Sequence, residues 1–183
     1  MQFGFSAHRV AVIGVLSVAI SVRVGLAQAD DPCAAFTWDV RHERTLFDHE
    51  PQTLAAGETL ESSPTLRTER LYQLQLRRQT QVTLVASPGR KSPTESGYAG
   101  LANVTVDTAG VYRVALDQPV WVDVFASGHL VRAKDFQGRP GCSAPHKIVE
   151  FELPARTAIT LQFSGGSAPT LKVAVTRSPT QES

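Results

Sequence analysis

The sequence predicts an all-β protein, an antiparallel Greek-key β-sandwich with a short N-terminal helix or arm. From Leu71 onward, apolar residues recur at every second position in short runs, which is the period of a half-buried strand. Gly, Pro, Ser or Asn residues separate these runs and supply the turns. Many short strands with turn signals between them are typical of a sandwich.

Residues 1–29 have the pattern of a cleavable export signal. Basic character at His8 and Arg9 precedes an apolar stretch over residues 10–20, and the small residues Ala27 and Ala29 mark a cleavage site, although Arg23 interrupts the region before it. The apolar stretch is too short to remain as a membrane span. We therefore expect a periplasmic or secreted protein without stable membrane insertion after cleavage.

Length and charge predict one domain that does not bind nucleic acid. Cleavage after Ala29 leaves 154 of the 183 residues, enough for a single domain to bury its own core. The signal holds two of the 18 Lys and Arg residues and none of the 17 acidic ones, so the mature chain has a net charge near −1. Basic pairs at residues 77–78 and 90–91 are isolated, whereas nucleic acid requires a clustered basic face.

The two cysteines, Cys33 and Cys142, are expected to form a disulfide because the chain leaves the reducing cytosol. Such a bond closes a loop of about one hundred residues and contributes roughly 4 to 5 kcal/mol in the chain-entropy model. A redox-active pair or a metal site is the alternative. Both usually need a close Cys-x-x-Cys spacing, which this chain lacks.

Residues 30–70 show a less regular pattern and are expected to form an N-terminal arm. Thr37 is a fair helix cap, and residues 41–44 then give a charged helix face, whereas Trp38 and Val40 are the alternative start of a strand. We expect the arm to pack against the end of the sandwich, where Cys33 holds it. The polar tail over residues 178–183 is expected to be flexible.

Residues 71–177 are the expected sandwich body of the same single domain. Asp107, Gly110 and Tyr112 match a D-x-x-G-x-Y corner of Greek-key sandwiches, in which the tyrosine hydroxyl bonds the backbone upstream and fixes a crossover between sheets. The predicted strands cover residues 72–76, 82–84, 101–106, 112–116, 120–125, 130–136, 149–153, 159–163 and 171–175.

The fifth predicted strand contains the first candidate binding residues. It is apolar on both faces except for Asp123, which lies between Trp121 and Phe125 on one strand face and is costly if buried without a partner. In one interpretation the aromatic side chains belong to the core, and Asp123 lies at a sheet rim or pairs with Arg113 or Arg132. In the other, the acid and the aromatic residues contact a ligand.

The start of the mature chain resembles a group of small exported bacterial proteins. These begin Asp-Pro-Cys-Ala-Ala-Phe-x-Trp-Asp-Val and continue with Glu-Arg, as residues 31–40 and 43–44 do here. Residues 110–116 and the Val- and Trp-rich strand after them also resemble the bacterial pre-peptidase C-terminal type of domain, a secreted sandwich. This second resemblance covers about half of the mature chain.

Some proteins similar to the first group have the name homogentisate dioxygenase, which implies iron held by two histidines and a carboxylate. His42 and His49 are the candidate ligands, joined through the fold by a glutamate or His129, with iron or zinc as the metal. Seven residues separate His42 from His49, so a helix places them on one side but about 10 Å apart. Because that distance is too large for one metal without a bend, surface histidines on a charged arm are the simpler interpretation.

The sequence therefore favours a non-catalytic exported module, without a cofactor, that binds a glycan, a peptide or an envelope protein through an edge strand or end loops. A metal-dependent enzyme of dioxygenase type is the alternative, and a structural subunit of an envelope assembly is a third hypothesis. The chain lacks a Gly-x-Ser-x-Gly nucleophile elbow, and Glu150 and Glu152 are expected to face solvent. The expected ligand contacts are Trp121, Asp123, Phe125 and Tyr98.

Overall fold

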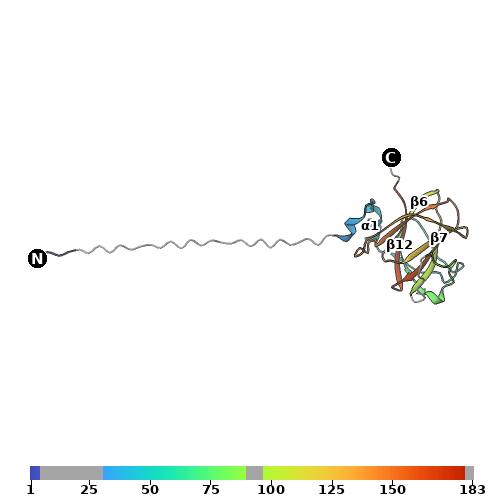
Figure 1. The fold of residues 1–183 in the computed structure, drawn as a ribbon, viewed down its shortest axis with the longest axis horizontal. Coiled ribbons are helices and arrows are strands. Elements are labelled where there is room, and N and C mark those ends of the chain that lie inside the picture. Colours follow the sequence, from blue (N-terminus) through green and yellow to red (C-terminus); the bar gives the residue numbers. More distant parts are fainter. Residues whose placement is uncertain (5–30, 90–96, 180–183) are drawn as a thin grey trace.

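The computed structural model describes residues 1–4, 31–89 and 97–179 (Figure 1). Residues 5–29 of the expected export signal and residues 180–183 of the expected tail lie outside these ranges. Within the described part of the chain, no helix has both the length and the apolar character needed to cross a membrane.

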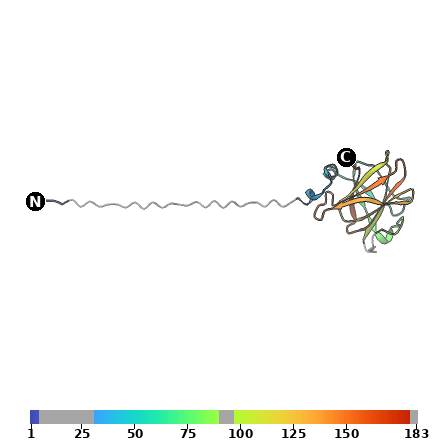
Figure 2. The same ribbon diagram turned by 45° about the horizontal axis from the view of Figure 1, so that its top comes forward.

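Two sheets pack face to face to form a β-sandwich (Figure 1, Figure 2). Sheet A has the strand order β1 (Gln52–Ala55), β3 (Leu71–Gln75), β12 (Thr170–Arg177), β6 (Gly110–Leu116), β10 (Lys147–Leu153) and β9 (Ala133–Gly138). Sheet B has the order β2 (Thr65–Leu66), β5 (Tyr98–Val104), β11 (Ile159–Gly166), β7 (Trp121–Ala126) and β8 (His129–Val131), with β4 (Arg77–Arg78) beside β5. The helical segments are η1 (Pro32–Ala35), α1 (Arg41–Phe47) and η2 (Gln79–Gln81).

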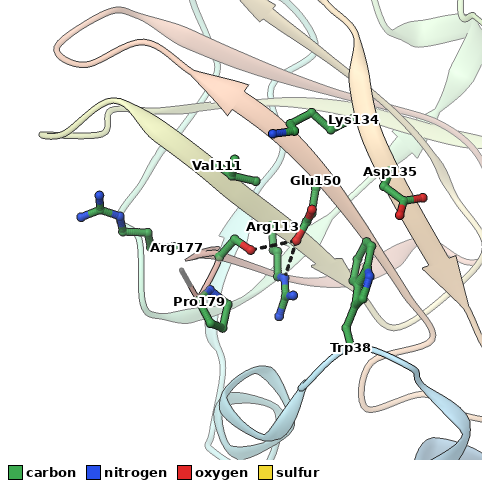
Figure 3. Close-up of a pocket in the computed structure, with 9 residues that line it drawn as sticks. Trp38, Val111, Arg113, Lys134, Asp135, Glu150, Arg177 and Pro179 are labelled. Carbon is green, nitrogen blue, oxygen red and sulfur yellow. Dashed lines mark hydrogen bonds and ion pairs between the residues drawn. The ribbon is translucent and has the colours of Figure 1, made fainter. Parts of the chain in front are cut away.

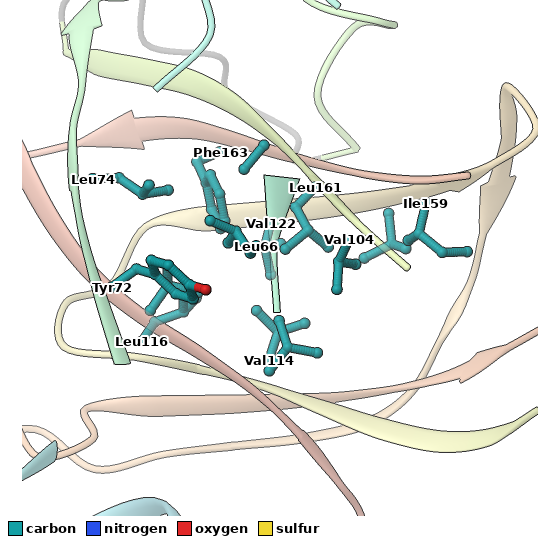
Figure 4. Packing of buried hydrophobic residues seen from close by; sticks show 14 of the residues in the cluster. Leu66, Tyr72, Leu74, Val104, Val114, Leu116, Val122, Ile159, Leu161 and Phe163 are labelled. Atoms are coloured by element: carbon teal, nitrogen blue, oxygen red, sulfur yellow. The ribbon is translucent and has the colours of Figure 1, made fainter. Parts of the chain in front are cut away.

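The core lies between the sheets and follows the predicted alternation. Val114 and Leu116 of sheet A and Leu161 and Phe163 of sheet B belong to one cluster of buried side chains (Figure 4). All four are fully buried. Their neighbours in the sequence point to the outer faces, because successive side chains of a strand alternate between the two faces.

The predicted antiparallel pairing is wrong at two edges. β1 pairs with β3 in parallel, and β2 pairs with β5 in parallel. After β1, the chain passes through β2 in the other sheet before it returns to sheet A as β3, and such a crossover permits parallel pairing. The remaining pairs are antiparallel across the described strands. The Greek-key connection remains a prediction.

Two of the predicted strands also differ from the structure. Residues 82–84 form no strand. The backbone that follows them, at Val85 and Ala86, is bonded by the Gln162 side chain instead of by a neighbouring strand. The predicted strand over residues 130–136 divides at Arg132 into β8 of sheet B and β9 of sheet A. The alternation of apolar and polar residues continues where the chain passes from one sheet to the other. Hydrophobic periodicity therefore does not reveal that these residues form two strands.

The tyrosine corner is confirmed. The Tyr112 hydroxyl donates a hydrogen bond to the carbonyl oxygen of Thr108 at 2.8 Å. Tyr112 lies in β6 of sheet A, and the preceding strand, β5, belongs to sheet B. The corner therefore fixes the point at which the chain passes from one sheet to the other.

The segment over residues 31–47 covers the outer face of sheet A rather than the end of the sandwich. We call this segment the arm. Val40 and Phe47 are buried against Leu71, Ile148 and other small or apolar residues of that face. The helix begins at Arg41 with Val40 as its N-cap, which offers no side-chain oxygen, so the predicted Thr37 cap is wrong. Thr37 instead contacts the Gln137 side chain on β9.

Residues 48–70, expected as part of an arm, supply strands to both sheets. β1 joins the edge of sheet A, and β2 joins the edge of sheet B. A backbone that would otherwise lie unpaired on the surface is thus satisfied by the ladders of the two sheets.

The predicted disulfide joins Cys33 of the arm to Cys142, with a Cα–Cα distance of 5.0 Å. Asp31 caps η1 by accepting the Cys33 backbone N–H at 2.9 Å, and this bond is the main cause of the lowered pKa of Asp31. Arg44 adds an ion pair to Asp31 at 3.0 Å. Helix and disulfide therefore meet at the same end of the arm.

Candidate functional site

The outer face of sheet A has an apolar half and a polar half. The apolar half, which includes Leu71, Ala115, Ile148 and Ala174, lies beneath the arm. The polar half lies further along the same strands and contains Arg113, Glu150 and Thr176. Strand alternation places a polar residue here on each of β6, β10 and β12, so the division between the halves follows from the sequence of each strand.

Arg113 is the central residue of the polar half. Its side chain is only 5% exposed, and its Nε donates to Glu150 Oε1 at 2.9 Å. Nη1 donates to the Asp39 carbonyl oxygen at 2.8 Å, and the Trp38 ring lies 5.0 Å from the guanidinium carbon. Arg113 thereby binds the sheet to the arm through a carboxylate, a backbone carbonyl and an aromatic face.

Glu43 supplies the second acid beside Arg113. Its Oε1 accepts the Thr176 hydroxyl at 2.9 Å and lies 3.4 Å from Arg113 Nη1. Its Oε2 is buried and has no hydrogen-bond partner. The one acid of the charged helix face over residues 41–44 thus turns to the sheet, where it joins Glu150 in a cluster of two carboxylates around one guanidinium.

An open pocket lies over this cluster. It has a volume of about 570 Å³, within the range of small-molecule sites. The arm contributes one aromatic wall, and four neighbouring strands, β12, β6, β10 and β9, contribute the rest. The lining residues are Trp38, Val111, Arg113, Lys134, Asp135, Glu150, Arg177, Ser178 and Pro179.

The charged residues of the pocket are arranged along its length (Figure 3). Trp38 and Asp135 lie together at one end, and Arg177 lies at the other. Between them, Glu150 accepts hydrogen bonds from Arg113 and from the Ser178 hydroxyl, the latter at 2.8 Å. The middle of the pocket is thus internally satisfied, and its two ends offer groups for a ligand.

A bulge in β9 directs two charged side chains to the pocket. The register of β9 against β10 shifts between Glu150, opposite Asp135, and Phe151, opposite Ala133. The extra residue is Lys134, and it lines the pocket together with Asp135. Bulges of this kind commonly redirect a side chain at the edge of a sheet.

The structure covers Asp123 instead of exposing it as a ligand contact. Asp123 is 7% exposed and accepts hydrogen bonds from Trp121 Nε1 at 2.9 Å and Gln162 Nε2 at 3.3 Å. The Gly89 backbone N–H adds a third at 3.4 Å. The predicted partners Arg113 and Arg132 are not among these donors, because the register of β7 against β11 places Gln162 directly opposite Asp123.

The aromatic neighbours of Asp123 lie on the outer face of sheet B. Phe125 is 4% exposed and Trp121 is half-buried. A segment over residues 79–89 passes across this face and is bonded to Gln162. Neither side chain belongs to the cluster between the two sheets, and their role as ligand contacts stays a prediction. Tyr98, the other candidate, is half-buried, and the Arg78 guanidinium lies 4.8 Å from its ring.

The two candidate metal ligands lie on or after α1. His42 forms an ion pair with Glu69, and His49 borders a second, more open hollow between α1 and β1. Among the described residues, no group of three or more His, Cys, Asp or Glu side chains is arranged to hold a metal ion. His129 lies at the start of β8, and His146 Nδ1 donates a hydrogen bond to the Cys142 carbonyl oxygen, so the fold gives each histidine a separate environment.

Sequence reasoning missed the residues that form the pocket. It expected Glu150 and Glu152 to face solvent, which is right for Glu152, whereas Glu150 is largely buried against Arg113. The signal that could have revealed the pair is a charged residue in the middle of each of two apolar strands. Pairing them requires the register of β6 against β10, which places Glu150 directly opposite Arg113.

The fold and the pocket together define a small disulfide-bonded β-sandwich with an open polar pocket beside its N-terminal arm. Comparison of the chain with protein-family models and with curated proteins found no match. The pocket itself is therefore the basis for the functional argument.

Proposed function

We propose that this protein is an exported, non-catalytic Greek-key β-sandwich module that binds an envelope glycan in the pocket on sheet A. The observation on which the proposal depends is the pocket's combination of an aromatic side chain with several hydrogen-bonding groups in a hollow of about 570 Å³. Sugars bind through both, because their apolar ring faces pack on aromatic rings and their hydroxyls exchange hydrogen bonds with charged side chains.

Location outside the cytoplasm is part of the proposal. Support comes from the pattern of residues 1–29 and from the Cys33–Cys142 disulfide, since structural disulfides persist in oxidising compartments. The periplasm and the external medium both satisfy this condition.

A peptide ligand that adds a strand to the edge of sheet A is less well supported. The edge strands of sheet A are β1 and β9; β9 is the one that borders the pocket, and its bulge interrupts regular pairing. The Asp135 side chain also accepts the Phe136 backbone N–H at 2.7 Å, so one of the edge donors is already satisfied. Bulges and charged side chains are devices that protect edge strands from pairing.

Glycan-array binding of the mature, oxidised protein tests the proposal. The array first identifies the sugars that the wild-type protein binds. We expect Trp38→Ala to abolish binding to those sugars, because it removes the aromatic wall of the pocket. Tyr98→Ala is the matched control, since Tyr98 is also half-buried beneath a guanidinium but lies on sheet B.

Binding that survives Trp38→Ala and disappears with Tyr98→Ala would move the site to the residues that the sequence suggested. A protein that is folded and retains no sugar would overturn the proposal. A circular dichroism spectrum of each variant separates lost binding from lost folding.

A further inference from the structure

We infer that the ligand of the sheet A pocket is an acidic oligosaccharide whose carboxylates are bound by Arg177 and Lys134. This inference rests on the proposed function and adds to it the chemical class of the sugar. Three features of the pocket support it. In the part of the chain that the structure describes, some of its charged groups already have an ion-pair partner and others do not, the charged groups follow a definite order along the pocket, and the two ends are further apart than one sugar ring.

The cation at the centre of the pocket is not available to a ligand. Arg113 is neutralised by Glu150 at 2.9 Å and by Glu43 at 3.4 Å, and its side chain is almost fully buried. The guanidinium also donates a hydrogen bond to the Asp39 carbonyl oxygen and stacks on the Trp38 ring. Arg113 therefore builds the floor and holds the arm, and it does not select the ligand by charge.

Arg177 has a different environment. It is exposed at the end of β12, and within residues 31–89 and 97–179 its guanidinium makes no hydrogen bond or ion pair. A Cβ atom at Gly110 would lie 3.8 Å from Arg177 Nη2, so the guanidinium lies close over the β6 backbone at the pocket's end. A planar guanidinium with free N–H donors is suited to a carboxylate, which accepts two parallel hydrogen bonds.

Lys134 adds a second cation, nearer the middle of the pocket. The bulge in β9 brings its side chain over Glu150 and toward the middle of the pocket (Figure 3). Its ammonium group lies 3.5 Å from Glu152 Oε2, and both side chains are at least half exposed, so this contact is weak and competes poorly with a ligand carboxylate.

The opposite end of the pocket suits sugar hydroxyls. Asp135 offers carboxylate oxygens beside the Trp38 ring, and a carboxylate accepts hydroxyl donors. Between Asp135 on β9 and Arg177 on β12 lie three strand-to-strand steps, which amount to about 14 Å at the usual spacing. A ligand that reaches both ends is therefore longer than one sugar ring and is anionic at the Arg177 end.

Isothermal titration with matched sugar pairs tests the inference. The probes are uronic-acid oligosaccharides, such as trigalacturonate, each with its fully methyl-esterified form, which has the same rings without the charge. We expect the acid to bind at least tenfold more tightly than the ester, and added salt to weaken only the acid. Arg177→Gln is expected to reduce the acid's affinity about tenfold and to leave the ester's unchanged, since a charge-assisted bond is lost.

Arg67→Gln is the matched control, because Arg67 is an exposed arginine between β2 and β3, outside the pocket. Its loss is expected to change neither affinity. Equal binding of acid and ester, with the loss of both on Trp38→Ala, would overturn the inference and leave the proposed function intact. Binding of a hexaglutamate peptide with no binding to any sugar of the panel would overturn both, and so would the absence of any binding.

Discussion

The outer faces of the two sheets are covered in different ways. On sheet A, a charged residue, Arg113, holds the arm through carboxylates and a carbonyl. On sheet B, a neutral residue, Gln162, holds the segment over residues 79–89 through three hydrogen bonds to the Val85 and Ala86 backbone. A fourth bond joins it to Asp123 on the neighbouring strand β7. In both cases a polar side chain in the middle of a strand anchors irregular backbone to a sheet.

The two anchors differ in what they leave open. The Gln162 amide bonds both the N–H groups and a carbonyl of the segment above it, and Asp123 beneath that segment is buried. Around Arg113, one carboxylate oxygen of Glu43 has no partner, and an open pocket adjoins the cluster. The charged anchor, one arginine bonded to two acids, thus lies beside the open pocket. The amide anchor lies beneath the segment over residues 79–89 that it holds.

Removal of the disulfide is expected to have the largest effect and to affect only the sheet A cover. The double substitution Cys33→Ser with Cys142→Ser should lower the free energy of unfolding by about 4 kcal/mol, because it restores the entropy of a long loop to the unfolded chain. Hydrogen exchange should increase over residues 31–47 and remain unchanged over residues 79–89. Equal increases in both segments would show that the covers are coupled.

Arg113→Met is expected to cost about 3 to 4 kcal/mol of unfolding free energy, because it leaves two carboxylates without their cation in a buried cluster. Urea denaturation measures the change. Adding Glu43→Gln should recover part of the loss, since it removes one of the uncompensated charges and keeps the oxygen that Thr176 bonds. A double variant no more stable than Arg113→Met alone would contradict the charge argument.

Gln162→Leu tests the neutral anchor, and we expect a loss of about 2 to 3 kcal/mol. The partly buried hydrogen bonds from the N–H groups of Val85 and Ala86 would lose their acceptor, but no charge would be left without a partner. Gln75→Leu, at the exposed end of β3, is a control of the same chemistry. A loss larger than that of Arg113→Met would reverse the order of the two anchors.

The smallest expected effect belongs to Asp117, an acid at the end of β6 that lies in neither cover. Burial raises its pKa above the usual 3.8, although it accepts the Lys172 backbone N–H at 3.0 Å. A folded-state pKa above the unfolded value gives stability that is complete at low pH and decreases as pH rises through the folded pKa. Asp117→Asn should therefore raise the melting temperature more at pH 7 than at pH 3.5, and an equal shift at both values would contradict this assignment.

The sequence predicts strand alternation well because each strand records locally which side chains face the core. Tyr112 and its corner were predictable for the same reason, since all the partners lie within five residues. The disulfide was predictable from the expected export signal and from the presence of two cysteines. Each of these features depends on local pattern or on composition.

The pocket was not predictable, because it depends on register and on covering segments. Asp123 was recognised as an anomaly, but its partner Gln162 is 39 residues away and meets it only through one register of β7 and β11. Arg113 and Glu150 are paired in the same way across β6 and β10. Alternation predicts which face of the sheet a side chain lies on, but not which residue lies opposite it on the next strand. The register shift in β9 that redirects Lys134 is likewise not visible in the hydrophobic periodicity.

The separation of 109 residues between Cys33 and Cys142 sets an order of assembly. Synthesis proceeds from the N-terminus, so the arm is the first part of this domain to leave the ribosome. The surface on which it rests includes Ala115, Ile148 and Ala174, which are made much later. The earliest segment of the domain therefore has no binding surface until those residues are made, and until then its cysteine is unpaired and its apolar residues are uncovered.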